Sequence, residues 1–182
     1  MPEKNKSAFL TWVAKIPTAL WGPVVAGILM LVVGLIGFAS GRLLLCPSLG
    51  PSAFEHSEQL KENASRFYNT LMGHMIALGA GFLAVALVNA WDAPPVLSTH
   101  TLTLARVGAA TLAVALTLAA VTLARASHPP AAATTLLVAL GSFRTGGDAL
   151  TVFLGVLVLA LLGEVARQVR IRALQAPNPS AG

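Results

Sequence analysis

Four long apolar runs constrain this chain more than any other feature of its sequence. They cover residues 24–45, 70–90, 107–124 and 149–163. About 20 apolar residues in a helix cross the ~30 Å hydrocarbon core of a bilayer, and the upstream neighbours of the last run can lengthen it. Charged residues make up 10% of the 182 positions, against about 25% in an ordinary soluble domain. The sequence therefore predicts an all-α polytopic membrane protein with four long transmembrane helices.

Two shorter segments interrupt this pattern. Residues 46–54 (CPSLGPSAF) follow the first run, and residues 127–140 (SHPPAAATTLLVAL) follow the third. An arginine precedes the first proline of each segment by four or five residues. A proline in the first turn of a helix is tolerated, because its missing N–H would have no partner there. We interpret each segment as a sharp break followed by a short broken or re-entrant helix.

The order of long span, broken short helix and long span occurs twice, which indicates an internal duplication. The predicted bounds are a cytoplasmic basic N-terminus (1–20), a membrane domain (21–166) with repeat A at about 21–91 and repeat B at about 102–166, and a cytoplasmic basic tail (167–182). Interrupted apolar segments at matching places in two halves are typical of a transporter binding site.

The basic residues predict the topology. If only the long runs cross, seven of the 12 Lys and Arg residues lie on the side of the termini and five on the other. If the short segments cross too, the counts are nine and three. The second count fits the excess of Lys and Arg in cytoplasmic loops better. Against it, residues 47–54 are too few to span and are followed by Glu55, His56 and Glu58, so both topologies stay open. Both counts place the two termini in the cytoplasm. A coherent basic face with stacking aromatic residues is missing, so nucleic acid is not an expected partner.

The segment 127–140 contains the first group of candidate binding residues. The first N–H groups of a helix that restarts after His128, Pro129 and Pro130 lack intrahelical partners, and together with the helix dipole they favour an anion. Further candidates are a charge one turn upstream and two hydroxyls downstream: Arg125, Thr134 and Thr135. The alternative is that the prolines simply end a helix and His128 caps it at the membrane interface.

A second group of candidates opens the second long run. Arg66, Asn69 and Gly73 follow one another at about one-turn intervals on one helical face, with His74 beside it. A glycine allows another helix or a solute to approach the backbone closely. The alternative is a snorkelling arginine with a structural histidine. The polar candidates of the first break are Arg42, Ser48 and Ser52.

Neither a metal nor another cofactor is expected. The chain has one cysteine, Cys46, and His74 and His128 lack a third Cys, Asp or Glu at ligand spacing. The sequence Gly-Phe-Ala-Ser-Gly at 37–41 is weakly similar to the serine loop of rhomboid proteases, but it lies in an apolar run where small residues favour close packing. A His-Glu-x-x-His motif and paired carboxylates are both missing, so the chain is predicted not to be an enzyme.

The sequences SHPPAAATTLL (127–137), SLGPSAF (48–54) and Asn69-x-x-x-Gly73-His74 resemble the HPP family of integral membrane proteins, over about residues 21–163. The first short segment differs from the usual Gly-Ala-Ser-Ala pattern and turns acidic at Glu55. The resemblance implies a four-spanning, multi-pass protein of the bacterial inner membrane. Members in cyanobacteria and chloroplasts are associated with nitrite transport.

We therefore expect transport of a small inorganic anion, nitrite by family resemblance, at a site formed by the broken helices and buried arginines. The expected partners are this anion, the lipid bilayer and further copies of the chain, because four long spans can scarcely enclose a polar pathway. The simplest assembly is a homodimer, with larger homo-oligomers also open. The alternatives are a non-transporting membrane scaffold or assembly protein and, less favoured, an intramembrane enzyme.

Overall fold

The computed structural model describes the backbone of residues 3–176 and the side chains of residues 8–176. Within that range the chain is helical, with no strand. The elements are α1 (Glu3–Lys15), α2 (Thr18–Ser40), α3 (Leu49–Glu58), η1 (Asn63–Ser65), α4 (Phe67–Leu87), α5 (Val96–Thr99), α6 (Leu104–Leu123), α7 (Ala131–Ala139) and α8 (Gly146–Gln175). Helices α2, α4, α6 and α8 are long and apolar enough to cross a membrane. The predicted all-α polytopic class, with two short helices between long ones, is confirmed.

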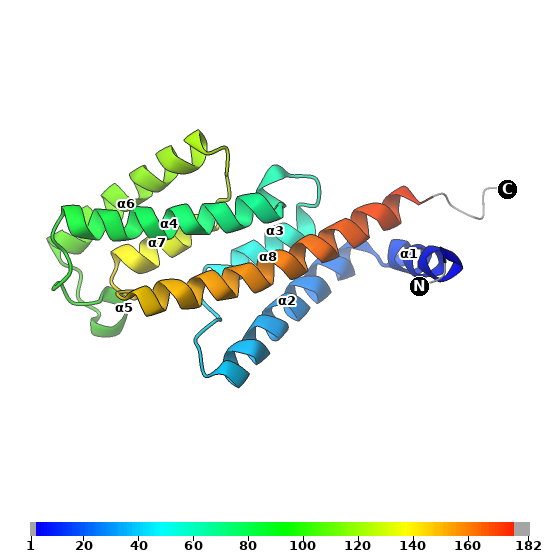
Figure 1. The fold of residues 1–182 in the computed structure, drawn as a ribbon, viewed down its shortest axis with the longest axis horizontal. Helices are drawn as coiled ribbons and strands as arrows, with labels where there is room; N and C mark the ends of the chain where they lie inside the picture. Colours follow the sequence, from blue (N-terminus) through cyan, green and yellow to red (C-terminus); the bar gives the residue numbers. More distant parts are fainter. Residues whose placement is uncertain (1–2, 177–182) are drawn as a thin grey trace.

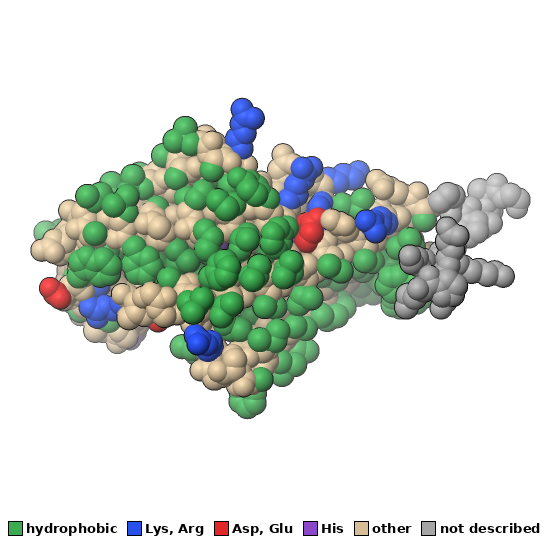
Figure 2. Space-filling view, in the orientation of Figure 1, with side chains coloured by type: hydrophobic (Ala, Val, Ile, Leu, Met, Phe, Trp, Pro, Cys, Tyr) green, Lys and Arg blue, Asp and Glu red, His purple; other side chains and the backbone are tan. Residues whose placement is uncertain are grey.

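The outer surface of the bundle is apolar. Large side chains such as Phe38 and Leu104 are 88% and 90% exposed, and apolar side chains cover most of the face shown in Figure 2. Such a surface would be unstable against water, whereas lipid covers it without cost. The long helices therefore present their outer faces to the bilayer.

The connection between α3 and α4 and the one between α4 and α6 lie at opposite ends of the bundle (Figure 1). At one end, the loop 59–66 meets the last turns of α8, where Arg167 Nη1 donates to Leu60 O over 2.8 Å. Helix α1 and both termini lie at this end. At the other end, Arg144 Nη2 donates to Trp91 O over 2.6 Å. We call these the terminal end and the distal end.

The two ends differ in charge. Of the 12 basic residues, three lie toward the distal end and nine toward the terminal end. The nine include those of the loop 59–66, which lies beside α8. They also include Arg125 in the break after α6, which lies beside the first turn of α4. The distal three are Arg42, Arg106 and Arg144. This distribution matches the count in which both short segments also cross. Each short helix thus returns the chain to the end from which the preceding long helix came (Figure 1).

Both breaks begin with a residue in the left-handed conformation. Helix α2 stops at Ser40, earlier than the predicted 45, because Gly41 adopts φ +65° and Arg42 N bonds back to Gly37 O over 3.0 Å. After α6, Arg125 adopts φ +50° and Ala126 N bonds to Val121 O over 2.9 Å. Both are Schellman-type ends, in which a left-handed residue allows the chain to turn back.

The chain after each break packs against its own protein. A Cβ atom placed on Gly34 of α2 would lie 2.9 Å from Leu45 Cδ1, and one on Gly37 would lie 3.3 Å from Leu44 Cβ. Non-helical backbone at membrane depth is tolerated when protein covers it in this way. These two glycines therefore give room to the chain's own segment.

The two halves share their close contacts at a constant offset of 82 residues. Helices α3 and α7 begin 82 residues apart, at Leu49 and Ala131. A Cβ atom on Gly73 of α4 would lie 3.5 Å from both Ala131 Cβ and Ala126 O. Gly155 of α8 is 82 residues after Gly73. A Cβ atom on Gly155 would lie 3.4 Å from Leu49 Cδ1 and 2.7 Å from Leu44 O. Leu49 and Leu44 are in turn 82 residues before Ala131 and Ala126. Each half therefore packs its short helix against the last long helix of the other half. The paired helices α4 and α8 run in opposite directions (Figure 1).

Both terminal segments contain helix in the described residues. The predicted N-terminal region 1–20 contains a helix, α1, and the predicted tail 167–182 continues α8 as far as Gln175. Arg170, which is buried, joins the two by donating from Nη2 to Ile16 O over 2.8 Å. A charged residue near a helix end is usually exposed to solvent. The sequence spacing therefore did not predict that Arg170 is buried and contacts another helix.

Candidate functional site

Polar side chains from both halves meet in the interior of the bundle. They come from the segment leading into α3, from α3 itself, from the first third of α4 and from the segment that contains α7. Each is more than nine-tenths buried. We call this set the His–Ser cluster: Ser48, Ser52, Glu55, His74, His128 and Thr134.

Ser52 lies between two imidazole rings at the centre of the cluster. Its Oγ atom is 3.0 Å from His74 Nε2 and 2.9 Å from His128 Nε2. The two rings are 5.1 Å apart, in an edge-to-face arrangement. A residue of the first half thus connects the histidine of α4 to the histidine of the second break.

The cluster continues on the other side of His74. Its Nδ1 atom is 2.7 Å from Thr134 Oγ1, which donates to Ser48 Oγ over 2.8 Å. Ser48 Oγ also lies 3.1 Å from Cys46 Sγ. Cys46 is therefore the buried end of a continuous chain of hydrogen-bonding side chains.

The protonation of His128 is constrained by its surroundings. Its Nδ1 atom faces two oxygen atoms, Ala64 O at 2.8 Å and Glu55 Oε2 at 2.9 Å. A carbonyl oxygen can only accept, so Nδ1 must carry a hydrogen. If Nε2 also donates to Ser52, the ring is an imidazolium and Glu55 is its counter-ion.

Glycine and proline place these residues. A Cβ atom on Gly73 would lie 2.8 Å from His128 Cβ, so the glycine gives His128 room to reach the cluster. Pro129 and Pro130 separate His128 from α7, and the amides at the start of α7 are occupied. Ala131 N donates to His128 O over 3.0 Å, and Ala132 N donates to Pro129 O over 3.0 Å. The free amide donors predicted for an anion at this helix start are therefore used within the turn.

The prediction that buried arginines form part of the site is wrong for the three arginines named from the sequence. The side chains of Arg42, Arg66 and Arg125 are exposed and lie outside the cluster. Two other arginines are buried, Arg106 and Arg170, and their guanidinium groups bind backbone carbonyls. An exposed end is favourable for an arginine near a break in a membrane helix, because the long side chain reaches the interface.

The remaining predicted residues support the cluster from outside. Asn69 Nδ2 donates to Ser127 O over 3.3 Å and so holds the segment before His128. Thr135 is 2.8 Å from Thr117 of α6, on the other side of α7 from the cluster. Outside the predicted set, Glu164 of α8 forms an ion pair with Arg167, one helical turn later, at 2.7 Å.

Glu55 is the residue that sequence reasoning missed. It follows Ser52 by one helical turn, so the two residues share a face of α3. That relation is visible in the sequence, but its meaning depends on His128, which is 73 residues away and is brought close only by the fold. The described residues contain no group of three or more His, Cys, Asp or Glu side chains arranged to hold a metal ion.

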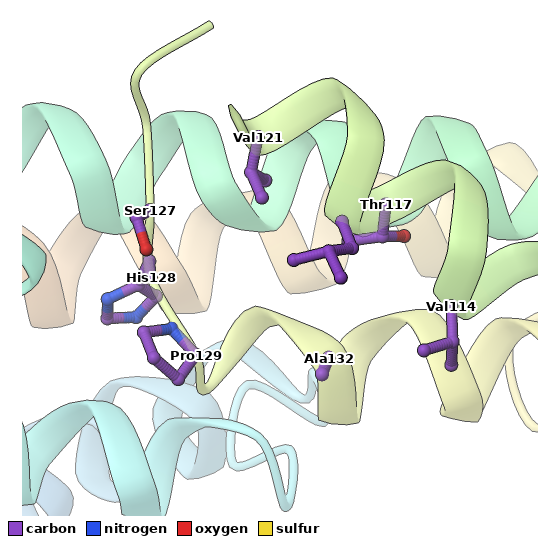
Figure 3. A pocket seen from close by; sticks show the side chains of 8 residues that line it. Val114, Thr117, Val121, Ser127, His128, Pro129 and Ala132 are labelled. Carbon is purple, nitrogen blue, oxygen red and sulfur yellow. The ribbon is translucent and has the colours of Figure 1, made fainter. Parts of the chain in front are cut away.

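Two surface hollows reach the neighbourhood of His128. One, of about 250 Å³, lies between α6 and the start of α7 and is lined by Val114, Val121 and His128 among others (Figure 3). The other, of about 500 Å³, lies between α3 and α7 and is lined by Glu55, Pro129 and Pro130 among others. The His128–Glu55 pair therefore lies at the edge of the cluster, beside an open hollow.

The family model for the transmembrane region of HPP proteins matches residues 12–175. The chain belongs to the HPP family. No curated protein and no solved structure gave a match. The HPP model covers all four long helices and both short ones, so the His-Pro-Pro sequence at 128–130 and the His–Ser cluster lie inside the matched region.

Proposed function

We propose that this HPP protein transports a small inorganic anion across the membrane, with the His–Ser cluster as its binding site. The observation that carries the proposal is the meeting of two interrupted segments, one from each half, around buried imidazole and hydroxyl groups. In carriers of known type, discontinuous helices with polar side chains near mid-membrane are where solutes bind. Ionisable residues are costly at that depth and mark solute or ion pathways.

The chemistry of the cluster suits a small oxyanion. Ser52, Thr134 and both histidines can donate hydrogen bonds, and His128 can carry a positive charge. Glu55 shows that a carboxylate oxygen can approach His128 Nδ1 to 2.9 Å. Nitrite has the same bent arrangement of two oxygens as a carboxylate, and the family resemblance favours it as the substrate.

Flux into proteoliposomes tests this function. Purified protein should take up nitrite faster than protein-free vesicles, and faster than it takes up sulfate, which is too large to replace a single carboxylate. Uptake at the protein-free rate for every anion in a panel would contradict the proposal and favour a scaffold or assembly role.

An enzymatic role is the alternative raised by the geometry. Ser52, His128 and Glu55 contact one another in the order of a serine–histidine–acid triad, at 2.9 Å in both steps. Ser52, however, is fully buried inside a helix, and His74 Nε2 lies 3.0 Å from its Oγ atom. A nucleophile needs an open approach for the carbonyl that it attacks. Transport is therefore the function that the enclosed serine supports better.

We further propose that the terminal end faces the cytoplasm of a bacterium, because nine of the 12 basic residues gather there. Reporter fusions at Met1, at Gly182 and in the loop 59–66 should all give cytoplasmic signals. A periplasmic signal from the loop with cytoplasmic signals from both termini would contradict the arrangement of the ends. We also propose assembly as a homo-oligomer in the membrane, through the exposed apolar faces of the long helices.

A further inference from the structure

One oxygen of Glu55 is buried without a hydrogen-bond donor. Glu55 is 7% exposed, and among the described residues none donates to its Oε2 atom. The hydrogen on His128 Nδ1 is directed to Ala64 O, although Glu55 Oε2 lies 2.9 Å from the same nitrogen. Buried carboxylates usually accept several hydrogen bonds, so this oxygen has unused capacity beside an open hollow.

The position of this oxygen is where an anion would bind. An anion that approaches from the hollow meets Glu55 and the prolines first. To reach the His128 ring it must displace the Glu55 carboxylate, because both need the same positive partner. The displaced carboxylate would then be a buried charge without a counter-ion, which is strongly unfavourable at membrane depth.

We propose that Glu55 takes up a proton when the anion binds at His128, so that one proton travels with each anion. This inference rests on the proposed anion transport. In the empty state, the His128 imidazolium and the Glu55 carboxylate neutralise each other. In the loaded state, the anion neutralises the imidazolium and the protonated Glu55 is neutral. Both states have zero net charge in the pair and its ligand, so the carrier moves no unbalanced charge through the bilayer.

The proton step is simple and balanced. A proton from the aqueous phase forms an O–H bond at a Glu55 carboxylate oxygen on the side of entry. The same bond breaks and the proton leaves when the anion is released on the other side. The anion itself is unchanged, and no electron is transferred.

Three other titratable groups near the pair each have at least one side-chain contact of their own. His74 of α4 is bonded to Ser52 and Thr134. His56 of α3 contacts Thr70 Oγ1 at 3.0 Å. On α8, Glu164 is paired with Arg167. Glu58 of α3 also lines the hollow, but its side chain is exposed. Glu55 is the acid that contacts His128 and lines the hollow as well.

Glu55→Gln separates coupling from transport. An amide resembles the protonated carboxyl group but cannot release a proton. With nitrite on both sides of the vesicle and equal pH, isotope exchange does not require the empty carrier to return. The variant should therefore exchange ¹⁵N-nitrite above the protein-free rate, although more slowly than wild type because Glu55 is part of the binding site. With a pH gradient and the membrane potential clamped, wild-type protein should accumulate nitrite with one proton per anion, and Glu55→Gln should fall to the protein-free rate.

Two further variants make the result decisive. Glu55→Asp keeps a carboxyl group and should retain part of the proton-driven accumulation. Glu62→Gln, an exposed position in the loop after α3, should behave as wild type in both assays. Accumulation by Glu55→Gln at the wild-type rate, or wild-type nitrite flux without proton movement, would overturn the inference while leaving the transport function intact. If the wild-type protein shows no exchange, the proposed function fails and the inference fails with it.

Discussion

His128→Gln is expected to reduce nitrite uptake about 10- to 100-fold. The glutamine can still form a neutral hydrogen bond to Ser52, but it cannot carry the positive charge that an anion needs. Hydrogen bonds to charged groups contribute about 1.5–3 kcal/mol, and each ~1.4 kcal/mol corresponds to a factor of ten. Initial rates of ¹⁵N-nitrite exchange in proteoliposomes measure the effect.

His56→Gln is the matched control for this variant. His56 is also fully buried, and it bonds to Thr70 outside the cluster. The His56→Gln protein should therefore keep most of the wild-type exchange activity. Equal loss in both variants would show that any buried histidine is needed for folding, and equal retention would remove His128 from the binding site.

Gly73→Val is expected to prevent stable folding, with a cost of at least ~3 kcal/mol, at the upper end of what overpacking a core produces. Its Cβ atom would lie 2.8 Å from His128 Cβ, a distance that real Cβ contacts essentially never show. The neighbour that must move is part of a break anchored by hydrogen bonds to Asn69, Ser52 and Ala64. Thermal unfolding in detergent, followed by size-exclusion chromatography, measures the loss.

Gly79→Val provides the control on the same helix. Nothing lies within 4 Å of a Cβ atom at Gly79, and its surface is exposed, so this variant should remain as stable as wild type. Gly155→Val should be as damaging as Gly73→Val, because its Cβ atom would lie 2.7 Å from Leu44 O. A stable Gly73→Val protein would contradict the packing of α4 against the second break.

The long helices and the two breaks were predictable because their causes are local. Apolar length determines a membrane span, and a proline pair cannot continue a helix. The histidines, serines and Thr134 were also identified from the sequence, since polar groups in apolar runs are costly wherever they fall. The fold then brought these residues from separate segments to one place.

The arginines and Glu55 were misjudged for the opposite reason. Whether a charged side chain near a break points into the bundle depends on the backbone conformation at the end of the helix. The spacing of residues along the sequence does not specify that conformation. Arg125 adopts a left-handed backbone conformation (φ +50°) and its side chain is exposed. Glu55 appeared to mark the end of a segment, but its partner His128 lies in the other half of the chain.

The opposite directions of the two halves bear on how the protein is made. Each half presents the same order of long, short and long helices to the insertion machinery, but must end in the reverse orientation. Hydrophobicity alone favours neither orientation, because an apolar helix can cross the bilayer equally well in both directions. The unequal sharing of nine and three basic residues between the ends of the bundle breaks this equality. The distal end, which holds Arg42, Arg106 and Arg144, is therefore where added Lys or Arg residues would most disturb biogenesis, by leaving some molecules inserted upside down.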